Sequence, residues 1–262
     1  MQKVRLKLRG IEQVLIGNVT EQGSIEIQGI DYEIDTLPFD VPVTGTIYGT
    51  LLNYKGAYEQ LKEKMYEKPY QKPPEAPVLY IKPKNTYVGY GKAIPLPEDI
   101  EFLEVGAALG IVIGKTASKV SKDEALDYIE GYTVVNDVSI PHESVHRPAV
   151  KEKAHDGFCP IGPWITYSGC VKDPNALNIK VAINGEMVQE NSTKNLIRSV
   201  ETLLEDVTEF MTLYKGDVLL VGVPENAPLV KENDYVKIEI EGIGVLENRV
   251  VPERIVAKGG ML

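Results

Sequence analysis

Short apolar runs and alternating apolar and polar residues dominate the hydrophobic pattern of this chain. At its start, Val4, Leu6 and Leu8 alternate with charged residues, which is the period of a half-buried strand. Other segments alternate in the same way or form apolar runs of strand length. These predicted strands are 14–19, 24–30, 78–81, 109–113, 179–183, 218–221 and 235–240.

Two segments have the spacing of apolar residues that is typical of helices. Ser121 and Glu124 are spaced as a capping box, and apolar side chains follow on one face before Gly131. A longer helix is predicted from near Thr193 to a stop at Gly216, because apolar residues recur there every three or four positions. With two helices among many strands, the predicted fold class is strand-rich α+β.

Glycines and prolines suggest how the chain is divided. Residues 1–43 combine short strand patterns with several glycines, which predicts a small N-terminal β appendage. Residues 44–262 form the predicted main domain. The run 68–77 contains four prolines, so it is expected to be a loop, and we consider it as a lid over a site.

Composition narrows the classes of function. The 28 basic and 38 acidic residues give a net charge of −10, which argues against a broad nucleic-acid or anionic-membrane surface. A few local lysines or arginines still suffice to bind a small anion. The chain has no apolar run of about 18 residues and no pattern of a signal peptide. With two cysteines only, a cytoplasmic protein is expected.

Several segments, in order, resemble the fumarylacetoacetate hydrolase family. They are 52–54, 80–83, 112–115, 131–139, 156–164, 216–217 and 239–248. Within that family, the variants at 81–86, 147–153 and 155–162 are similar to the N-terminal half of the bifunctional isomerase/decarboxylases of 4-hydroxyphenylacetate (homoprotocatechuate) degradation. The resemblance implies a mixed β-roll with short helices, usually dimeric, whose site lies between the roll and a mobile lid.

The same resemblance implies a reaction. The bifunctional enzymes that this chain resembles isomerise 2-hydroxyhepta-2,4-dienedioate or decarboxylate 5-oxopent-3-ene-1,2,5-tricarboxylate. In active family members a divalent cation, held by a Glu-x-Glu pair and an aspartate, stabilises the enolate of a chelated 2-oxo acid. The expected ligand of this chain is therefore a small anionic di- or tricarboxylate.

The expected metal ligands are incomplete in this sequence. Asp137 matches the aspartate, but the Glu-x-Glu pair aligns with Gly106 and Ala108. Glu104 lies on the same strand face, yet two residues displace it by about 6.6 Å, which metal–oxygen bonds of about 2.0–2.6 Å do not span without a bulge. A site for Mg2+ or Mn2+ is therefore disfavoured, and a simple turn or cap role for Asp137 is an equal alternative.

Hydrolysis is disfavoured by other positions. Where hydrolytic members have a His–Glu pair that activates water, this chain has Ala57 and Gln60. After the metal aspartate, the usual Ser-Ala-Arg is replaced by Ser139, Ile140 and Pro141. A metal-dependent hydrolase or acylpyruvase remains as an alternative only through the general family.

The remaining candidates are mostly cationic. Lys82 and Lys153 occupy places where the family has active-site lysines, and we predict that they are catalytic. Arg147, Lys151 and Tyr54 are predicted to contact the substrate. The alternative is that the basic side chains are solvated surface charges, and this weighs most for Lys151.

Histidine and cysteine give weaker signals. His142 and His146 have the four-residue spacing of a zinc pair on a helix, but prolines bound a segment too short for a stable helix. Surface or substrate-contact histidines are the favoured interpretation. Cys159 is expected to be a small buried side chain, since no His–acid pair can be assigned to it.

Two kinds of function remain. The chain is either an isomerase or decarboxylase that works without a metal, or a catalytically degenerate subunit that supports a metal-bearing paralogue. The first predicts a homodimer that turns over the substrate alone. The second predicts a hetero-oligomer in which the partner carries the Glu-x-Glu pair.

Overall fold

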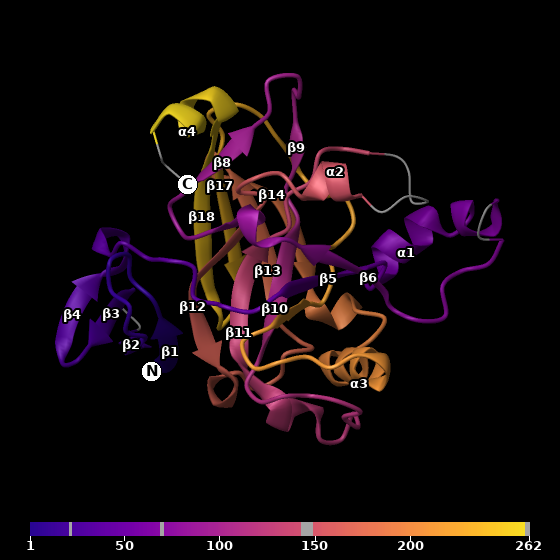
Figure 1. Ribbon diagram of the computed structural model, residues 1–262, viewed down its shortest axis with the longest axis horizontal. Helices are drawn as coiled ribbons and strands as arrows, with labels where there is room; N and C mark the ends of the chain where they lie inside the picture. The colour runs from indigo at the N-terminus through magenta and orange to yellow at the C-terminus, as the bar shows by residue number, and fades with distance from the viewer. Residues whose placement is uncertain (21–22, 69–70, 143–148, 260–262) are drawn as a thin grey trace.

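The computed structural model describes residues 1–20, 23–68, 71–142 and 149–259. Most of its strands belong to one large sheet, in the order β4-β3-β2-β1-β12-β11-β10-β15-β5-β6, with β7 paired to β12. Figure 1 shows β1 to β4 standing to one side of the central strands. The strands of this sheet are β1 Gln2–Leu6, β2 Leu15–Val19, β3 Ser24–Ile27, β4 Ile30–Glu33, β5 Ile47–Leu51, β6 Val78–Lys82, β7 Tyr87–Val88, β10 Ala107–Ile113, β11 Ile129–Asn136, β12 Cys159–Tyr167 and β15 Val218–Leu220.

A second sheet packs against the first. Its order is β14-β13-β17-β18-β8, and a two-stranded ribbon pairs β16 with β9. The inward faces of both sheets contribute to one apolar core, in which Leu109 and Val134 meet Val181 and Ile238. The bounds are β8 Ala93–Leu96, β9 Leu103–Glu104, β13 Asn178–Ile183, β14 Glu186–Ser192, β16 Leu229–Val230, β17 Tyr235–Ile240 and β18 Gly244–Pro252.

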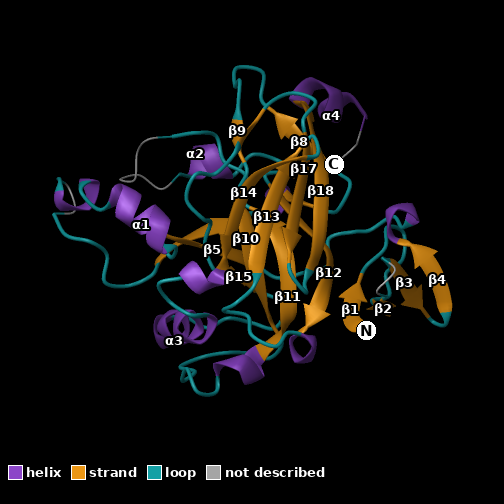
Figure 2. Ribbon diagram, turned by 180° about the vertical axis from the view of Figure 1, so that it is seen from behind, coloured by secondary structure: helices purple, strands orange, loops and turns teal. Residues whose placement is uncertain are grey.

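The helices are short and lie around the sheets, as Figure 2 shows. They are α1 Lys55–Leu61, α2 Val150–Lys153, α3 Val200–Phe210 and α4 Glu253–Gly259. Short 3-10 turns occur at Ile34–Thr36, Lys64–Tyr66, Lys84–Thr86, Ala125–Tyr128, Ser168–Cys170 and Thr193–Asn195. No helix among the described residues is long and apolar enough to cross a membrane. The strand-rich α+β class predicted from the sequence is confirmed.

The N-terminal strands have a small apolar core of their own. Leu6, Ile25 and Phe39 pack there against Trp164 of β12. The strand β1 continues the large sheet by pairing with β12, and the Trp164 indole donates a hydrogen bond of 2.8 Å to the carbonyl of Ile243. The division of the chain at residue 43 stays a prediction.

Predicted strand bounds are correct for β17, whereas the strand predicted at 24–30 is wrong. Gln28 and Gly29 have φ angles of 54° and 82°, so a tight turn separates β3 from β4. The sequence pattern missed this turn because Gln28 is an uncommon residue for the left-handed region.

Both predicted helices are wrong in extent. The segment after Ser121 forms only the turn Ala125–Tyr128 before β11 begins. The longer helix starts at Val200, because Asn53 binds the backbone N–H groups just before it: Ile197 donates to the Asn53 carbonyl at 2.7 Å and Arg198 to its Oδ1 at 2.9 Å. The helix then ends at Phe210, where the next residue is extended, rather than at Gly216.

Candidate active site

The end of strand β11 carries a buried carboxylate. Asp137 directly follows β11, and its backbone N–H donates a hydrogen bond of 2.8 Å to the carbonyl of Gly106 beside β10. The next residue, Val138, bonds to the carbonyl of Phe158 at 3.1 Å. The Asp137 side chain is completely buried. These backbone bonds fix the position of the carboxylate between two strands.

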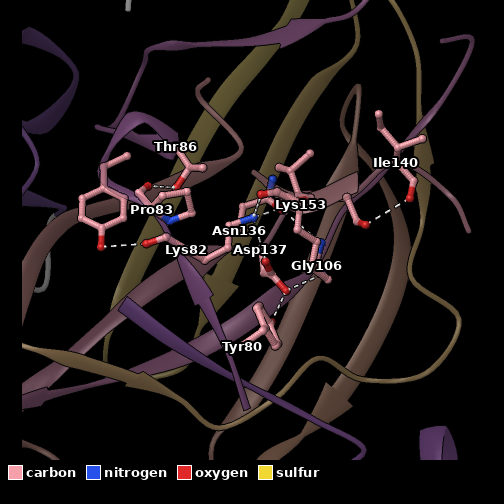
Figure 3. Close-up of polar contacts among 12 residues, drawn as sticks. Tyr80, Lys82, Pro83, Thr86, Gly106, Asn136, Asp137, Ile140 and Lys153 are labelled. Atoms are coloured by element: carbon pink, nitrogen blue, oxygen red, sulfur yellow. Dashed lines mark hydrogen bonds and ion pairs between the residues drawn. The ribbon is translucent and has the colours of Figure 1, made fainter. Parts of the chain in front are cut away.

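Two ammonium groups and one phenol hydroxyl surround this carboxylate. The Nζ atom of Lys82 lies 3.0 Å from Oδ1, and the Nζ atom of Lys153 lies 2.7 Å from Oδ2. The hydroxyl of Tyr80 donates a hydrogen bond to Oδ2. Figure 3 shows Tyr80 and Lys153 converging on Asp137, with Gly106 beside it. We call these four residues, Tyr80, Lys82, Asp137 and Lys153, the Asp137 cluster.

Lys82 is held entirely by the protein. Its side chain has no exposed surface, and its ammonium also donates to the carbonyls of Val138 at 3.1 Å and Lys153 at 2.6 Å. Two of its N–H donors are thus bound to carbonyls, and the carboxylate of Asp137 lies beside it as an ion-pair partner. Lys82 therefore joins the end of β11 to the end of helix α2, and this fixes where the Lys153 side chain begins.

Lys153 differs from Lys82 in its exposure. Its side chain is 13% exposed, and its ammonium lies 5.0 Å from the centre of the Tyr80 ring. The ammonium is therefore held against Asp137 and against an aromatic face, which favours a cation. Of the two lysine side chains in the Asp137 cluster, this is the one with exposed surface.

Tyr80 reaches Asp137 because of a glycine on the neighbouring strand. Gly49 pairs with Tyr80 between β5 and β6, and a Cβ atom at position 49 would collide with the Tyr80 ring. The ring therefore occupies the space above Gly49. The pKa of the Tyr80 hydroxyl is raised well above its ordinary value by burial and by the charge of Asp137, so it remains a donor.

The electrostatics of the Asp137 cluster favour a net positive charge. Burial alone would raise the pKa of Asp137, but Lys153, Lys82 and the hydrogen bonds from Lys153 and Tyr80 outweigh it and hold the pKa well below its ordinary value. Two lysines and one carboxylate together carry a charge of +1. A partly buried positive charge of this kind attracts an anion.

The described residues do not fit a divalent cation. Both oxygens of Asp137 already face cations or a hydroxyl, and Gly106 offers no side-chain oxygen. A Cβ atom at Gly106 would collide with the Asp137 carbonyl oxygen, and Ala108 is completely buried among apolar side chains such as Val135. No group of three His, Cys, Asp or Glu side chains within the described part of the chain could hold a metal ion.

The structure brings together three of the residues that the sequence singled out, namely Lys82, Asp137 and Lys153. Lys151 is exposed on α2. Tyr54 is completely buried, and the charge of Glu225, after burial itself, raises the pKa of its hydroxyl. No contact among the described residues joins Tyr54 to Asp137.

Other predicted residues lie elsewhere. Arg147 and His146 are outside the described residues, so the proposed zinc pair of His142 and His146 has no structural account, and His142 itself is exposed. Cys159 is a buried free thiol whose pKa is raised to about 12 by burial. A thiol with this pKa is a poor nucleophile. This agrees with the prediction that Cys159 is a small buried side chain.

Tyr80 was missed as a site residue, although its sequence carries a signal. Tyr80 and Lys82 are two positions apart on β6, so both side chains point to the same face.

A hollow of about 670 Å³ lies elsewhere, between α1, α3 and the start of β6. It is lined by residues such as Tyr58 and Arg198 and includes no member of the Asp137 cluster.

Replacing Asp137 by Asn should destabilise the protein strongly. The buried Lys82 and the mostly buried Lys153 would both lose their counter-charge, which lowers the free energy of unfolding by about 3–5 kcal/mol in such cases. Because the folded pKa of Asp137 lies below its ordinary value of 3.8, its stabilisation is complete above that pH and is lost as the pH falls. Urea unfolding at several pH values measures both effects. A stability difference between wild type and variant that does not shrink toward pH 3 would contradict this account.

Replacing Gly106 by Ala should also destabilise the protein, by about 1–3 kcal/mol, because the new methyl group meets backbone that cannot yield easily. The matched control is Gly169→Ala, where a Cβ atom has open space. Thermal and urea unfolding of both variants measure the difference. Equal stability of the two variants would show that the strand at Gly106 tolerates a side chain.

Comparison with known proteins agrees with these features. The model of the fumarylacetoacetate (FAA) hydrolase C-terminal family matches residues 46–251. A 4-hydroxyphenylacetate degradation bifunctional isomerase/decarboxylase of Salmonella dublin is 38% identical over 220 residues, which are 83% of this chain and 49% of that protein. A homoprotocatechuate catabolism bifunctional isomerase/decarboxylase of Escherichia coli is 40% identical over 80% of this chain and 48% of its own length. The chain thus spans about half the length of these curated relatives.

Solved structures match over nearly the whole chain. The crystal structure of 2-hydroxyhepta-2,4-diene-1,7-dioate isomerase from Mycobacterium marinum superposes with a TM-score of 0.78 at 27% identity, covering 97% of this chain and 99% of that one. The resemblance inferred from the sequence is confirmed by the family match, by the relatives and by this fold. The chain belongs to the fumarylacetoacetate hydrolase family.

Proposed function

We propose that this chain is a metal-independent isomerase of unsaturated 2-oxo dicarboxylates, with 2-hydroxyhepta-2,4-dienedioate as its substrate. The proposal is based on the partly exposed side chain of Lys153, whose ammonium is held against the buried carboxylate of Asp137. Relatives and structural neighbours that act in this chemistry support the choice of substrate. A tricarboxylate precursor, 5-oxopent-3-ene-1,2,5-tricarboxylate, is the second substrate that we propose, for decarboxylation.

Lys153 is the substrate-binding group in this proposal. Its ammonium donates hydrogen bonds to the 2-oxygen and the adjacent carboxylate of the substrate. It thereby stabilises the negative charge that develops when the enol is deprotonated. Loss of CO2 from the tricarboxylate would leave its electron pair on the same dienolate system. Both reactions therefore need the same cation at the same place.

The other members of the Asp137 cluster position this ammonium. Asp137 holds it from the buried side, and Lys82 ties the end of α2 to the end of β11. Tyr80 donates a second hydrogen bond to the same oxygen of Asp137, Oδ2, that Lys153 binds. A cation whose partners are fixed before the substrate arrives loses little energy in reorganisation, which is a main source of catalytic rate.

A second candidate function is a supporting subunit without activity of its own. The observation that favours it is the absence of the family's water-activating pair: Ala57 packs against the core, and Gln60 is exposed and donates to Asn226 at 2.9 Å. In that case a metal-bearing paralogue would complete a hetero-oligomer.

For the isomerase we propose a cytoplasmic homodimer.

Replacing Lys153 by Ala should lower kcat/KM for the dienedioate by about 100-fold or more, because one preorganised group that stabilises the enolate is lost. The control is Lys84→Ala, at an exposed lysine outside the Asp137 cluster. The assay follows loss of the dienol absorbance by chelator-treated protein, and thermal unfolding checks the fold of each variant. Wild-type activity should be unchanged by the chelator and by added Mg2+.

Two results would count against this proposal. Activity that appears only when Mg2+ or Mn2+ is added would contradict the metal-independent reaction. Activity that appears only after a metal-bearing paralogue is mixed in, and that survives Lys153→Ala, would favour the supporting subunit.

A further inference from the structure

Glu104 shares a sheet face with the buried carboxylate of the Asp137 cluster. The strand β9, Leu103–Glu104, bridges the segment after Asp137: Glu104 N–H donates to the Ser139 carbonyl at 2.8 Å, and Ser139 N–H returns a bond of 3.3 Å. Two positions along, the Asp137 N–H binds Gly106. Paired residues and residues two apart share a face. The Glu104–Ser139 pair therefore lies two residues along from the Gly106–Asp137 pair, and the side chains of Glu104 and Asp137 point to the same face of the sheet.

The carboxylate of Glu104 is half-buried and free. Among the described residues, no side chain or backbone group makes a hydrogen bond or an ion pair with it. Burial raises its pKa, and the charge of Asp137 adds to this, while His142 and Lys153 act in the opposite direction. A carboxylate whose pKa is raised is a stronger base than an exposed one, so it takes up a proton more readily.

We propose that Glu104 carries the proton between oxygen and carbon in the isomerisation. The inference rests on the proposed function, since it assigns a group to the reaction that Lys153 supports. Glu104 has a position that suits this work: its strand pairing places it beside Asp137 on the same face of the sheet, and no described residue binds its oxygens.

The proton transfer balances with Glu104 alone. Its carboxylate removes the proton from the 2-hydroxyl, and the O–H electron pair forms the C2 carbonyl. The two double bonds shift by one position, so that carbon 5 gains an electron pair and takes the proton from the Glu104 carboxyl. The carboxylate is thereby regenerated, the product is 2-oxohept-3-enedioate, and no oxidant or co-reactant is needed.

Other groups near the Asp137 cluster are less suited to this transfer. Tyr80 donates to Asp137, and its pKa is raised well above the ordinary value, first by burial. Asp137 is occupied by both ammonium groups. His142 is exposed, and its Nδ1 lies 3.0 Å from the Ile140 carbonyl. It is the one alternative carrier among the described residues that face Glu104, and the experiment includes it.

The test compares Glu104→Gln with Glu101→Gln, an exposed glutamate three residues earlier. Turnover is measured in D2O, and NMR records deuterium at carbon 5 of the product. We expect kcat to fall by about 100-fold or more in Glu104→Gln, with KM changed by less than about threefold. Glu101→Gln should behave as the wild type. His142→Ala should retain deuterium transfer.

Additional variants keep the inference testable if Glu104→Gln is unstable. Glu104→Asp keeps the charge but shortens the side chain by one methylene, which moves the carboxylate away from the reacting atoms. We therefore expect kcat to fall by about tenfold or more while KM stays similar. In Glu104→Ala, added acetate should restore part of the turnover, which a purely structural residue would not show.

The outcomes separate the two proposals. A wild-type chain that turns over the dienedioate, together with a Glu104→Gln variant of equal kcat, would overturn the assignment of Glu104 and leave the proposed function standing. A loss of activity in His142→Ala with retention in Glu104→Gln would assign the transfer to His142. A wild-type chain that neither turns over the substrate nor incorporates deuterium would overturn both.

Discussion

One buried carboxylate with two ammonium partners is the constraint on which the rest of the site depends. Asp137 lies where two strands of the large sheet meet, and Lys82 and Lys153 reach it from β6 and α2. Burying such a charge is costly unless its partners are in place. The cluster therefore ties together segments that are far apart in the sequence, and the requirement to satisfy Asp137 fixes the position of the Lys153 ammonium, whose side chain is partly exposed.

The arrangement also explains how a family fold can lose its metal ligands and keep a cationic centre. Without side-chain oxygens at Gly106 and Ala108, strand β10 packs closely against Asp137 and into the apolar core. An ammonium from α2 then occupies one side of the Asp137 carboxylate. A lysine supplies one positive charge where a divalent ion supplies two, so it lowers the pKa of a neighbouring carboxylate such as Glu104 by less, which leaves that carboxylate a better proton acceptor.

Much of this followed from the sequence, and the exceptions have physical causes. The strand at Tyr235–Ile240, the family, and the choice of Lys82, Asp137 and Lys153 as candidate site residues came from pattern and motif. That both lysines contact Asp137 is known only from the structure. The start of α3 did not, because Asn53, far away in the chain, binds the backbone there. Tyr80 was missed because its hydrogen bond to Asp137 depends on the space over Gly49, which only the paired strands reveal.

The central claim is that Lys153, rather than a metal ion, binds the 2-oxo acid. Isothermal titration of chelator-treated protein with 2-oxoadipate, a stable 2-oxo dicarboxylate, tests it most directly. If Lys153 is the binding group, 2-oxoadipate binds without metal, added Mg2+ leaves its affinity unchanged, and Lys153→Ala loses binding. Binding that requires Mg2+ and persists in Lys153→Ala would contradict it.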